Sequence, residues 1–271
     1  MSEVVTALAA RAPLLSLPLE FESVRLESVS VRYRVPRERY SGLKELAVRW
    51  AQGRLETFDV WALHDVSLSL RLGEIFGVVG VNGAGKTTLL KAIAGVLHPT
   101  EGRIWVQGSV APLLELGAGL HPELTGRENV FLYGTLLGNS RHHMRQAYDS
   151  IVDFAELDSF MDAPLRTYSS GMTARLAFAV ATHRRADVLL VDEVLAVGDM
   201  HFQEKCRRRM EEFRTEGATI LLVSHDPGLL TQMCDRVAWL ADGRVVAVGA
   251  ADEIVERYLA AGQRPVSEHR R

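Results

Sequence analysis

The stretch Gly80–Thr87, which reads GVNGAGKT, constrains what this chain can fold into more than any other feature of its sequence. It fits the pattern GxxxxGK[ST] at every fixed position. Glycines let the backbone curl so that successive N–H groups point at anionic oxygens, and a following helix adds its positive N-terminal end. By average residue usage, an accidental match arises in roughly one chain in a hundred of this length. We therefore interpret the stretch as a phosphate-binding loop between a strand and a helix.

The residues of this loop have separate expected roles toward a nucleoside triphosphate. Lys86 is expected to reach the β- and γ-phosphates as a point charge, and the hydroxyl of Thr87 is expected to ligate Mg²⁺. The expected nucleotide-binding residues of the loop and the helix start are Gly80, Asn82, Gly83, Ala84, Gly85, Lys86, Thr87 and Thr88.

Two adjacent carboxylates follow another apolar run, which reads VLLVDE and ends at Glu193. Asp192 is placed to hold Mg²⁺, commonly through water, and Glu193 lies where it can polarise an attacking water. His225 follows the next apolar run in the same way, where it could contact the γ-phosphate and hold the glutamate in position. The alternative interpretation is a pair of surface carboxylates and a structural histidine, which the phosphate loop in the same chain disfavours.

Apolar runs at residues 74–80, 187–192 and 218–224 have the composition of strands that are buried on both faces. They alternate with helical segments, so the sequence predicts an α/β fold with a parallel core sheet that binds ligands at the carboxyl ends of its strands. Other predicted elements are strands at 24–35, 61–72 and 103–108, helices within 117–155, after residue 172 and at 200–215, a hairpin at 237–249 that turns at Asp242-Gly243, and a helix at 252–261 capped by Asp252.

The loop YSSGM, Tyr168 to Met172, lies about twenty residues before the second carboxylate strand and resembles the signature loop of the ABC family, which is LSGGQ in most members. Ser169 and Gly171 match the serine and the second glycine of the family, whereas Tyr168, Ser170 and Met172 depart from its commonest form. The loop is similar to the variant found in ATPase subunits of bacterial polysaccharide exporters. The resemblance covers roughly residues 21–261.

The resemblance implies a P-loop NTPase (RecA-like) core sheet, an antiparallel N-terminal β part and an inserted helical subdomain at about residues 117–180. It implies an ATPase domain at residues 21–261, between an N-terminal arm at 1–20 and a C-terminal tail at 262–271. In this family the signature loop caps the ATP held by the opposite subunit, so we expect a homodimer that buries two ATP molecules with Mg²⁺. Asp199 matches the loop that crosses this interface, and Tyr33 matches the aromatic residue that stacks on adenine.

One departure concerns a glutamine that the family usually has between the phosphate loop and the helical region. Residues 112–129, PLLELGAGLHPELTGREN, contain none, and Glu115 or Leu116 falls at that position. Of these two, only Glu115 has suitable chemistry. A carboxylate near the γ-phosphate would need Mg²⁺ to offset repulsion, so we expect Glu115 to couple the ATPase to its transporter rather than to sense the metal.

The segment LLELGAGLHPELTGRENVFLYGTLLG and the YSSGM loop are similar to exporters of lipid-linked polysaccharides such as O-antigen, teichoic acid, capsule or cell-wall galactan. This implies a membrane permease as partner and a peripheral place at the cytoplasmic face of the cell (inner) membrane. The segment at residues 36–59 also resembles that group, and its basic residues could meet phosphates of lipid or substrate or belong to a solvated helix. These are Arg37, Arg39, Lys44, Arg49 and Arg54, beside an apolar stripe of Leu43, Leu46, Ala47 and Trp50.

The composition disfavours several classes of protein. The formal net charge of −3 lacks the basic footprint of a nucleic-acid-binding protein, so no nucleic acid is expected as a partner. Cys206 and Cys234 lack metal-ligand spacing and are expected to be reduced thiols. No run approaches the roughly 18 apolar residues of a membrane span. The chain ends about ten residues after the last predicted helix, so no sugar-binding module is expected there.

Other functions are compatible with a phosphate loop. The cargo could belong to another class than polysaccharides. A soluble ABC ATPase of translation or DNA repair usually carries two cassettes or long coiled coils, which this sequence lacks. A GTPase or kinase is disfavoured by the signature loop, by His225 and by the absence of an NKxD base reader. A non-catalytic regulator is disfavoured because both Glu193 and His225 are present.

Overall fold

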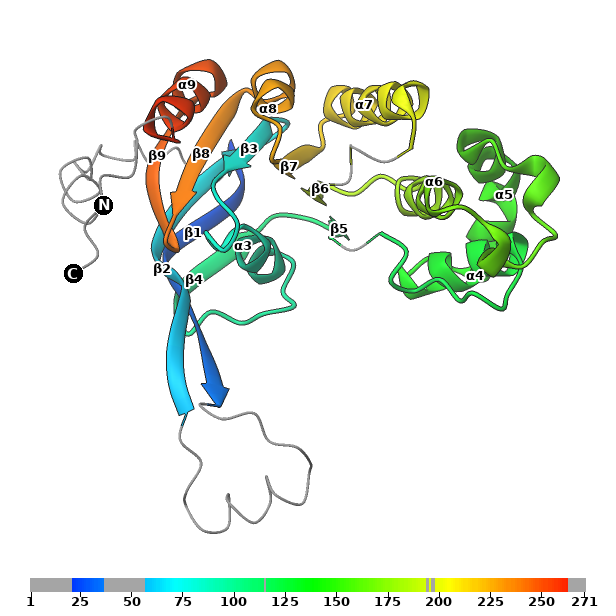
Figure 1. Cartoon of the computed structure of the whole chain (residues 1–271), viewed down its shortest axis with the longest axis horizontal. Coiled ribbons are helices and arrows are strands. Elements are labelled where there is room, and N and C mark those ends of the chain that lie inside the picture. The colour runs from blue at the N-terminus through cyan, green and yellow to red at the C-terminus, as the bar shows by residue number, and fades with distance from the viewer. Residues whose placement is uncertain (1–20, 37–56, 115, 194, 196–197, 263–271) are drawn as a thin grey trace, which may run out of the picture.

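The computed structural model describes residues 21–36, 57–114, 116–193, 195 and 198–262, and at its centre is a sheet of six strands (Figure 1). The strands lie in the order β5-β6-β7-β3-β8-β9, and neighbours are parallel except for β8 and β9. Their bounds are β3 (Ile75–Val79), β5 (Val110–Leu113), β6 (Val188–Asp192), β7 (Thr219–Val223), β8 (Arg236–Ala241) and β9 (Arg244–Ala250).

Alternate side chains of the central strands pack into two hydrophobic clusters on opposite faces of this sheet. In β3, Ile75 and Val79 belong to one cluster, and Phe76 and Val78 belong to the other. Strands that are buried on both faces must be apolar at nearly every position, which explains the uninterrupted apolar runs in the sequence. Three helices cover the first face and one covers the second: α7 (Met200–Thr215), α8 (Pro227–Met233) and α9 (Ala251–Gly262), and α3 (Lys86–Ile93) (Figure 1).

A second sheet has three antiparallel strands in the order β2-β1-β4. They are β1 (Glu22–Pro36), β2 (Thr57–Arg71) and β4 (Glu101–Val106). Leu26 of β1 and Leu68 of β2 are buried in the same cluster as Leu90 of α3, so this sheet packs with α3 against the central sheet. Beyond that contact, β1 and β2 continue away from the body of the protein as a two-stranded ribbon (Figure 1).

Three helices form a separate group beyond β5 and β6 (Figure 1). They are α4 (Gly126–Leu136), α5 (Arg141–Ala155) and α6 (Ser170–Ala181). Their own hydrophobic cluster joins Val130, Met144 and Leu176, all of them fully buried. α4 begins with a capping box, in which Thr125 and Glu128 satisfy each other's backbone N–H groups.

The α/β fold with a parallel core sheet and an antiparallel N-terminal part is confirmed. The turn at Asp242-Gly243 is also confirmed, with φ angles of 47° and 71° that match the tight turn of a hairpin. Among the described strands and α-helices, β5 and α8 were not predicted. β5 contains Pro112, which has no N–H to donate and is therefore confined to an edge strand. α8 is short and begins with Pro227.

The predicted cap of the last helix is wrong, because α9 begins at Ala251 and Asp252 lies inside its first turn. There its carboxylate accepts a hydrogen bond from the N–H of Glu253 at 2.8 Å and lies near the positive helix end. Glu115 and the basic segment at residues 37–56 lie outside the described residues. Within the described part of the chain, every helix is too short or too polar to cross a membrane.

Candidate nucleotide site

The predicted phosphate loop connects β3 to α3 at the carboxyl end of a central strand. Gly85, the last residue before α3, has a φ of 104°, which residues with a Cβ rarely adopt. The loop is also crowded by backbone from neighbouring strands. A Cβ at Gly80 would overlap the carbonyl oxygen of Leu240, and one at Gly85 would lie 2.5 Å from that of Ala62. The curled loop is therefore held in place, and glycine is required at both positions.

Lys86 begins α3, and its side chain points back into the loop. Its Nζ donates hydrogen bonds to the carbonyl oxygens of Gly80 at 2.8 Å and Val81 at 3.1 Å, and only 6% of the residue is exposed. Burial lowers the pKa of Lys86, whereas the nearby carboxylates of Glu193 and Asp192 raise it. The ammonium group and the N–H groups of the helix start thus face the same small space, which suits an anion.

Thr87 and Asp192 meet beside the loop. The hydroxyl of Thr87 donates a hydrogen bond to Oδ2 of Asp192 at 3.0 Å, from the first turn of α3 to the last residue of β6. Burial raises the pKa of Asp192, and the hydrogen bond from Thr87 opposes this shift. In the described ranges, no three His, Cys, Asp or Glu side chains are grouped to hold a metal. A hydroxyl and one carboxylate fit Mg²⁺, which usually binds to one or two carboxylates with phosphates and waters.

Glu193 and His225 follow two neighbouring strands, β6 and β7, and their side chains pair. Nε2 of His225 lies 2.6 Å from Oε1 of Glu193. Glu193 has a φ of 57°, which is unusual for a residue other than glycine and costs about 1–3 kcal/mol. Its N–H donates to the carbonyl oxygen of Val223 at 3.0 Å, which helps hold this conformation. Both side chains are exposed, so water can reach the carboxylate.

Tyr33 lies on β1 opposite Val60 of β2 and is 38% exposed. Its hydroxyl lies 3.5 Å from Oγ1 of Thr88, in the first turn of α3. The structure therefore places an exposed aromatic ring next to the phosphate loop, although the two are far apart in the sequence. Such a ring offers an apolar face on which a nucleotide base can stack.

The YSSGM loop ends at the N-terminus of α6. Oγ of Ser169 accepts a hydrogen bond from the N–H of Met172 at 3.2 Å and so caps the helix, while Ser170 is exposed. Among the described residues, no hydrogen bond or ion pair joins Ser169–Gly171 to the phosphate loop. The positive end of α6 is therefore presented to the outside of the chain.

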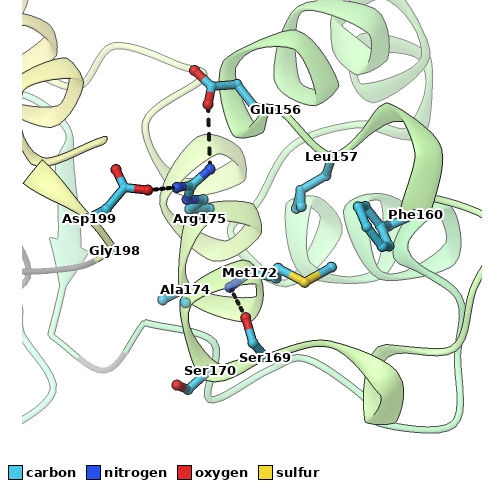
Figure 2. A pocket seen from close by; sticks show the side chains of 11 residues that line it. Glu156, Leu157, Phe160, Ser169, Ser170, Met172, Ala174, Arg175, Gly198 and Asp199 are labelled. Atoms are coloured by element: carbon cyan, nitrogen blue, oxygen red, sulfur yellow. Dashed lines mark hydrogen bonds and ion pairs between the residues drawn. The ribbon is translucent and has the colours of Figure 1, made fainter. Parts of the chain in front are cut away.

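A hollow of about 660 Å³ separates the YSSGM loop from Asp199 (Figure 2). Asp199 caps α7 by accepting a hydrogen bond from the N–H of Phe202 at 2.9 Å, and its second oxygen pairs with Arg175 of α6. Arg175 also lies 3.4 Å from the carboxylate of Glu156, which follows α5. One guanidinium thus joins the group of three helices to the start of α7.

The predicted residues therefore fall into two groups. Lys86, Thr87, Asp192, Glu193 and His225 lie together at one edge of the central sheet, with Tyr33 nearby. The YSSGM loop and Asp199 line the separate hollow. Sequence analysis missed the connecting roles of Arg175 and Glu156, because the acidic partners of Arg175 lie 19 and 24 residues away in the chain and no local pattern marks them.

Comparison with known proteins agrees with this arrangement. The sequence model of the ABC transporter family matches residues 63–196. An O-antigen export system ATP-binding protein, RfbB of Klebsiella pneumoniae, is 43% identical over 237 residues, which are 87% of this chain and 96% of the relative. The chain belongs to the family of ABC transporter ATP-binding proteins.

Other relatives of this ABC ATPase are longer. The chain spans 56% of the RfbB protein of Myxococcus xanthus, at 42% identity over 89% of its own length. The chain also spans 43% of the teichoic acids export ATP-binding protein TagH of Lactococcus lactis. The two are 44% identical over 74% of the present chain. Among solved structures, a dimeric ATP-binding cassette, MJ0796 bound to ADP and phosphate, superposes with a TM-score of 0.67 at 23% identity, covering 84% of this chain and 98% of that one. That likeness confirms the fold.

Replacing Lys86 by alanine is expected to weaken ATP binding by at least about tenfold, because hydrogen bonds to a charged group contribute about 1.5–3 kcal/mol. Calorimetric titration of the purified chain with ATP measures this affinity directly. Lys91→Ala, in the last turn of the same helix, is the matched control and should bind normally. Equal affinity in the two variants would remove Lys86 from the phosphate site.

Proposed function

We propose that this ABC ATPase binds Mg-ATP between two copies of the chain, hydrolyses it, and so powers export of a lipid-linked polysaccharide through a separate membrane permease. The observation that supports this most directly is the meeting of Lys86, Asp192, Glu193 and His225 at the carboxyl ends of three adjacent strands. At this edge, a loop that can cradle phosphates lies beside a carboxylate that can activate water. These are the two parts that phosphoryl transfer to water requires.

In this proposal the phosphate loop grips the triphosphate of ATP. Its N–H groups and the start of α3 meet the phosphate oxygens, and Lys86 adds a positive charge that is already oriented by two carbonyl groups. The ring of Tyr33 stacks on adenine. The contacting residues are those predicted from the sequence, Gly80, Asn82, Gly83, Ala84, Gly85, Lys86, Thr87 and Thr88.

Glu193 is the proposed general base. It draws a proton from water as the water oxygen bonds to the γ-phosphorus and the bond to the bridging oxygen breaks, which yields ADP and phosphate. His225 holds this carboxylate through the contact at 2.6 Å and faces the γ-phosphate. Thr87 and Asp192 would hold Mg²⁺, which when bound neutralises charge on the phosphates. The hydrogen bond between these two side chains keeps both oxygens on the same side of the loop.

The second half of the site comes from a second copy of the chain. Ser169–Gly171 and the N-terminus of α6 would face the γ-phosphate of ATP held by the partner, because Ser169 and Ser170 are exposed and no described hydrogen bond joins the loop to the phosphate loop of its own chain. Asp199 would lie at the same interface, tied to α6 by Arg175. A homodimer would therefore contain two ATP molecules, each held from both sides.

The export role rests on the relatives. Proteins named as ATP-binding subunits for O-antigen and teichoic acid export match this chain over most of its length, which supports a lipid-linked polysaccharide as cargo. A membrane permease would supply the path, and the ATPase would lie at the cytoplasmic face of the cell (inner) membrane. We place the ATPase domain at residues 21–261, its helical subdomain at about 117–180, and the coupling to the permease near Glu115, outside the described residues.

Replacing Glu193 by glutamine is expected to lower turnover by about 10²–10⁴-fold, the usual size of a general-base contribution, while ATP still binds. The variant should accumulate as an ATP-bound dimer, which size-exclusion chromatography with and without ATP would detect. Glu101→Gln, an exposed residue on β4, is the control and should turn over normally. Near-normal hydrolysis by the Glu193 variant would show that another group activates water.

Replacing Ser169 by tyrosine is expected to abolish hydrolysis without changing the ATP affinity of the monomer, because the signature loop acts on the partner's nucleotide. Ser140→Tyr is a matched control, since Ser140 caps α5 in the same way that Ser169 caps α6. Both variants lose a helix cap worth about 1 kcal/mol, and only the Ser169 variant should stop turning over. Loss of monomer binding in that variant would contradict a role across the dimer.

Cells that lack this chain are expected to make their lipid-linked polysaccharide but retain it inside, because synthesis does not need the transporter. Fractionation with surface labelling of the polymer measures this, and only the wild-type gene should restore export, not the Glu193→Gln variant. A normal polysaccharide surface in the deletion strain would rule out this cargo and leave the ATPase proposal standing.

A further inference from the structure

The segment before the signature loop is tied to the start of α4. The N–H of Arg127 donates to the carbonyl oxygen of Met161 at 2.9 Å, and the N–H of Leu165 donates to that of Leu124 at 2.9 Å. Further along, the N–H of Arg166 donates to the carbonyl oxygen of Pro122 at 2.8 Å. Two stretches about forty residues apart in the chain therefore form one corner of the helical group.

Asn129 makes the α4 side of this corner rigid. It is fully buried, and its Oδ1 accepts a hydrogen bond from the N–H of His121 at 2.7 Å. Its Nδ2 lies 3.0 Å from the carbonyl oxygens of His121 and Leu124. A buried amide with its polar atoms satisfied holds the turn before α4 in one conformation. The corner can therefore serve as a fixed support.

Tyr168, the first residue of the signature loop, attaches that loop to the corner. Its hydroxyl donates a hydrogen bond to the carbonyl oxygen of Phe160 at 2.7 Å, and the two rings pack edge to face at 6.4 Å. Phe160 lines the same hollow as Ser169 (Figure 2). Tyr168 thus joins the signature loop to Phe160, another residue that lines the hollow.

The position of the Tyr168 hydroxyl requires a glycine at the start of α4. Gly126 lies beside it, and a Cβ there would overlap the hydroxyl oxygen of Tyr168. The next nearest atoms to such a Cβ are Sδ of Met161 and Cζ of Tyr168, both at 3.2 Å. A side chain at position 126 is therefore excluded mainly by this one oxygen.

We propose that Tyr168 is a positioning residue of the signature loop: its hydrogen bond to Phe160, in the space that Gly126 leaves, fixes the loop so that Ser169 faces the partner's nucleotide. This rests on the proposed action of the loop across the dimer. It also accounts for a departure from the commonest signature, because a leucine at position 168 could pack but could not donate this hydrogen bond.

The test compares Tyr168 with Tyr148 of α5 in the full-length chain. Tyr168→Phe is expected to lower kcat about 3- to 10-fold, as for the loss of one ordinary hydrogen bond. Its affinity for a non-hydrolysable ATP analogue, measured on the monomer, should be unchanged. Tyr148→Phe is the control, because the Tyr148 hydroxyl is buried with no hydrogen-bond partner among the described residues, and it should keep normal turnover. Equal kcat in the two variants would overturn the proposal.

A second variant tests the link to Gly126. Gly126→Ala is expected to lower kcat more than about tenfold, since overpacking a fitted site costs more than one hydrogen bond. Adding Tyr168→Phe removes the overlapping oxygen, which is the closest contact of the new Cβ, and should recover most of the kcat that Gly126→Ala loses. Failure of this rescue would refute the coupling. Loss of monomer ATP binding in Ser169→Tyr would contradict the proposed action of the loop across the dimer. The rescue experiment is separate from that result, because it tests only whether the Tyr168 hydroxyl and Gly126 are coupled.

Discussion

The central sheet is buried on both faces, and the whole site depends on this burial. Because helices or a second sheet cover each face, the strands can present polar groups only at their ends. β3, β6 and β7 are buried along almost their whole length and are apolar except for Thr219 at the start of β7 and Asp192 at the end of β6, and the polar groups of the site come at or beyond the carboxyl ends of these strands. Parallel pairing aligns these ends at one edge. Lys86, Asp192 and His225 meet there for that reason.

Electrostatics then determines how these groups share a small space. The buried ammonium of Lys86 loses hydration, which lowers its pKa, and the carboxylates of Asp192 and Glu193 oppose that shift. Asp192 is itself half-buried, and its pKa rises for the same physical reason. The cluster therefore holds unlike charges close together around a buried ammonium group, which interacts with the carboxylates more strongly than it would in water. A triphosphate with Mg²⁺ brings both signs of charge, so the metal ion offsets part of the negative charge of the phosphates.

The proposed partner-facing half of the site is built differently. It uses a helix N-terminus, whose partial positive charge acts only on groups close to the first turn, so the direction in which the helix end points must be controlled. Arg175 ties α6 to α5 and α7 through Glu156 and Asp199, and Tyr168 ties the loop to Phe160, next to the segment that is hydrogen-bonded to the start of α4. These contacts lie away from the reacting atoms, yet they fix where the helix end points. The first turns of α6 are thereby anchored on both sides, by Tyr168 before the helix and by Arg175 within it.

Local chemistry made much of this predictable from the sequence. The glycines of the phosphate loop, the apolar runs and the polar residues that follow them are marked by residue type at fixed spacing, and backbone conformation at a loop depends mainly on its own residues. The turn at Asp242-Gly243 was predictable for the same reason.

Only the tertiary structure decided which distant residues pair. These pairings are β5 with its proline at a sheet edge, the contact of Tyr33 with Thr88, the ion pairs of Arg175, and the fit of Tyr168 against Gly126. These contacts join residues that are far apart in the chain and are brought together when whole helices and strands pack. The spacing of residue types along the sequence therefore does not predict them.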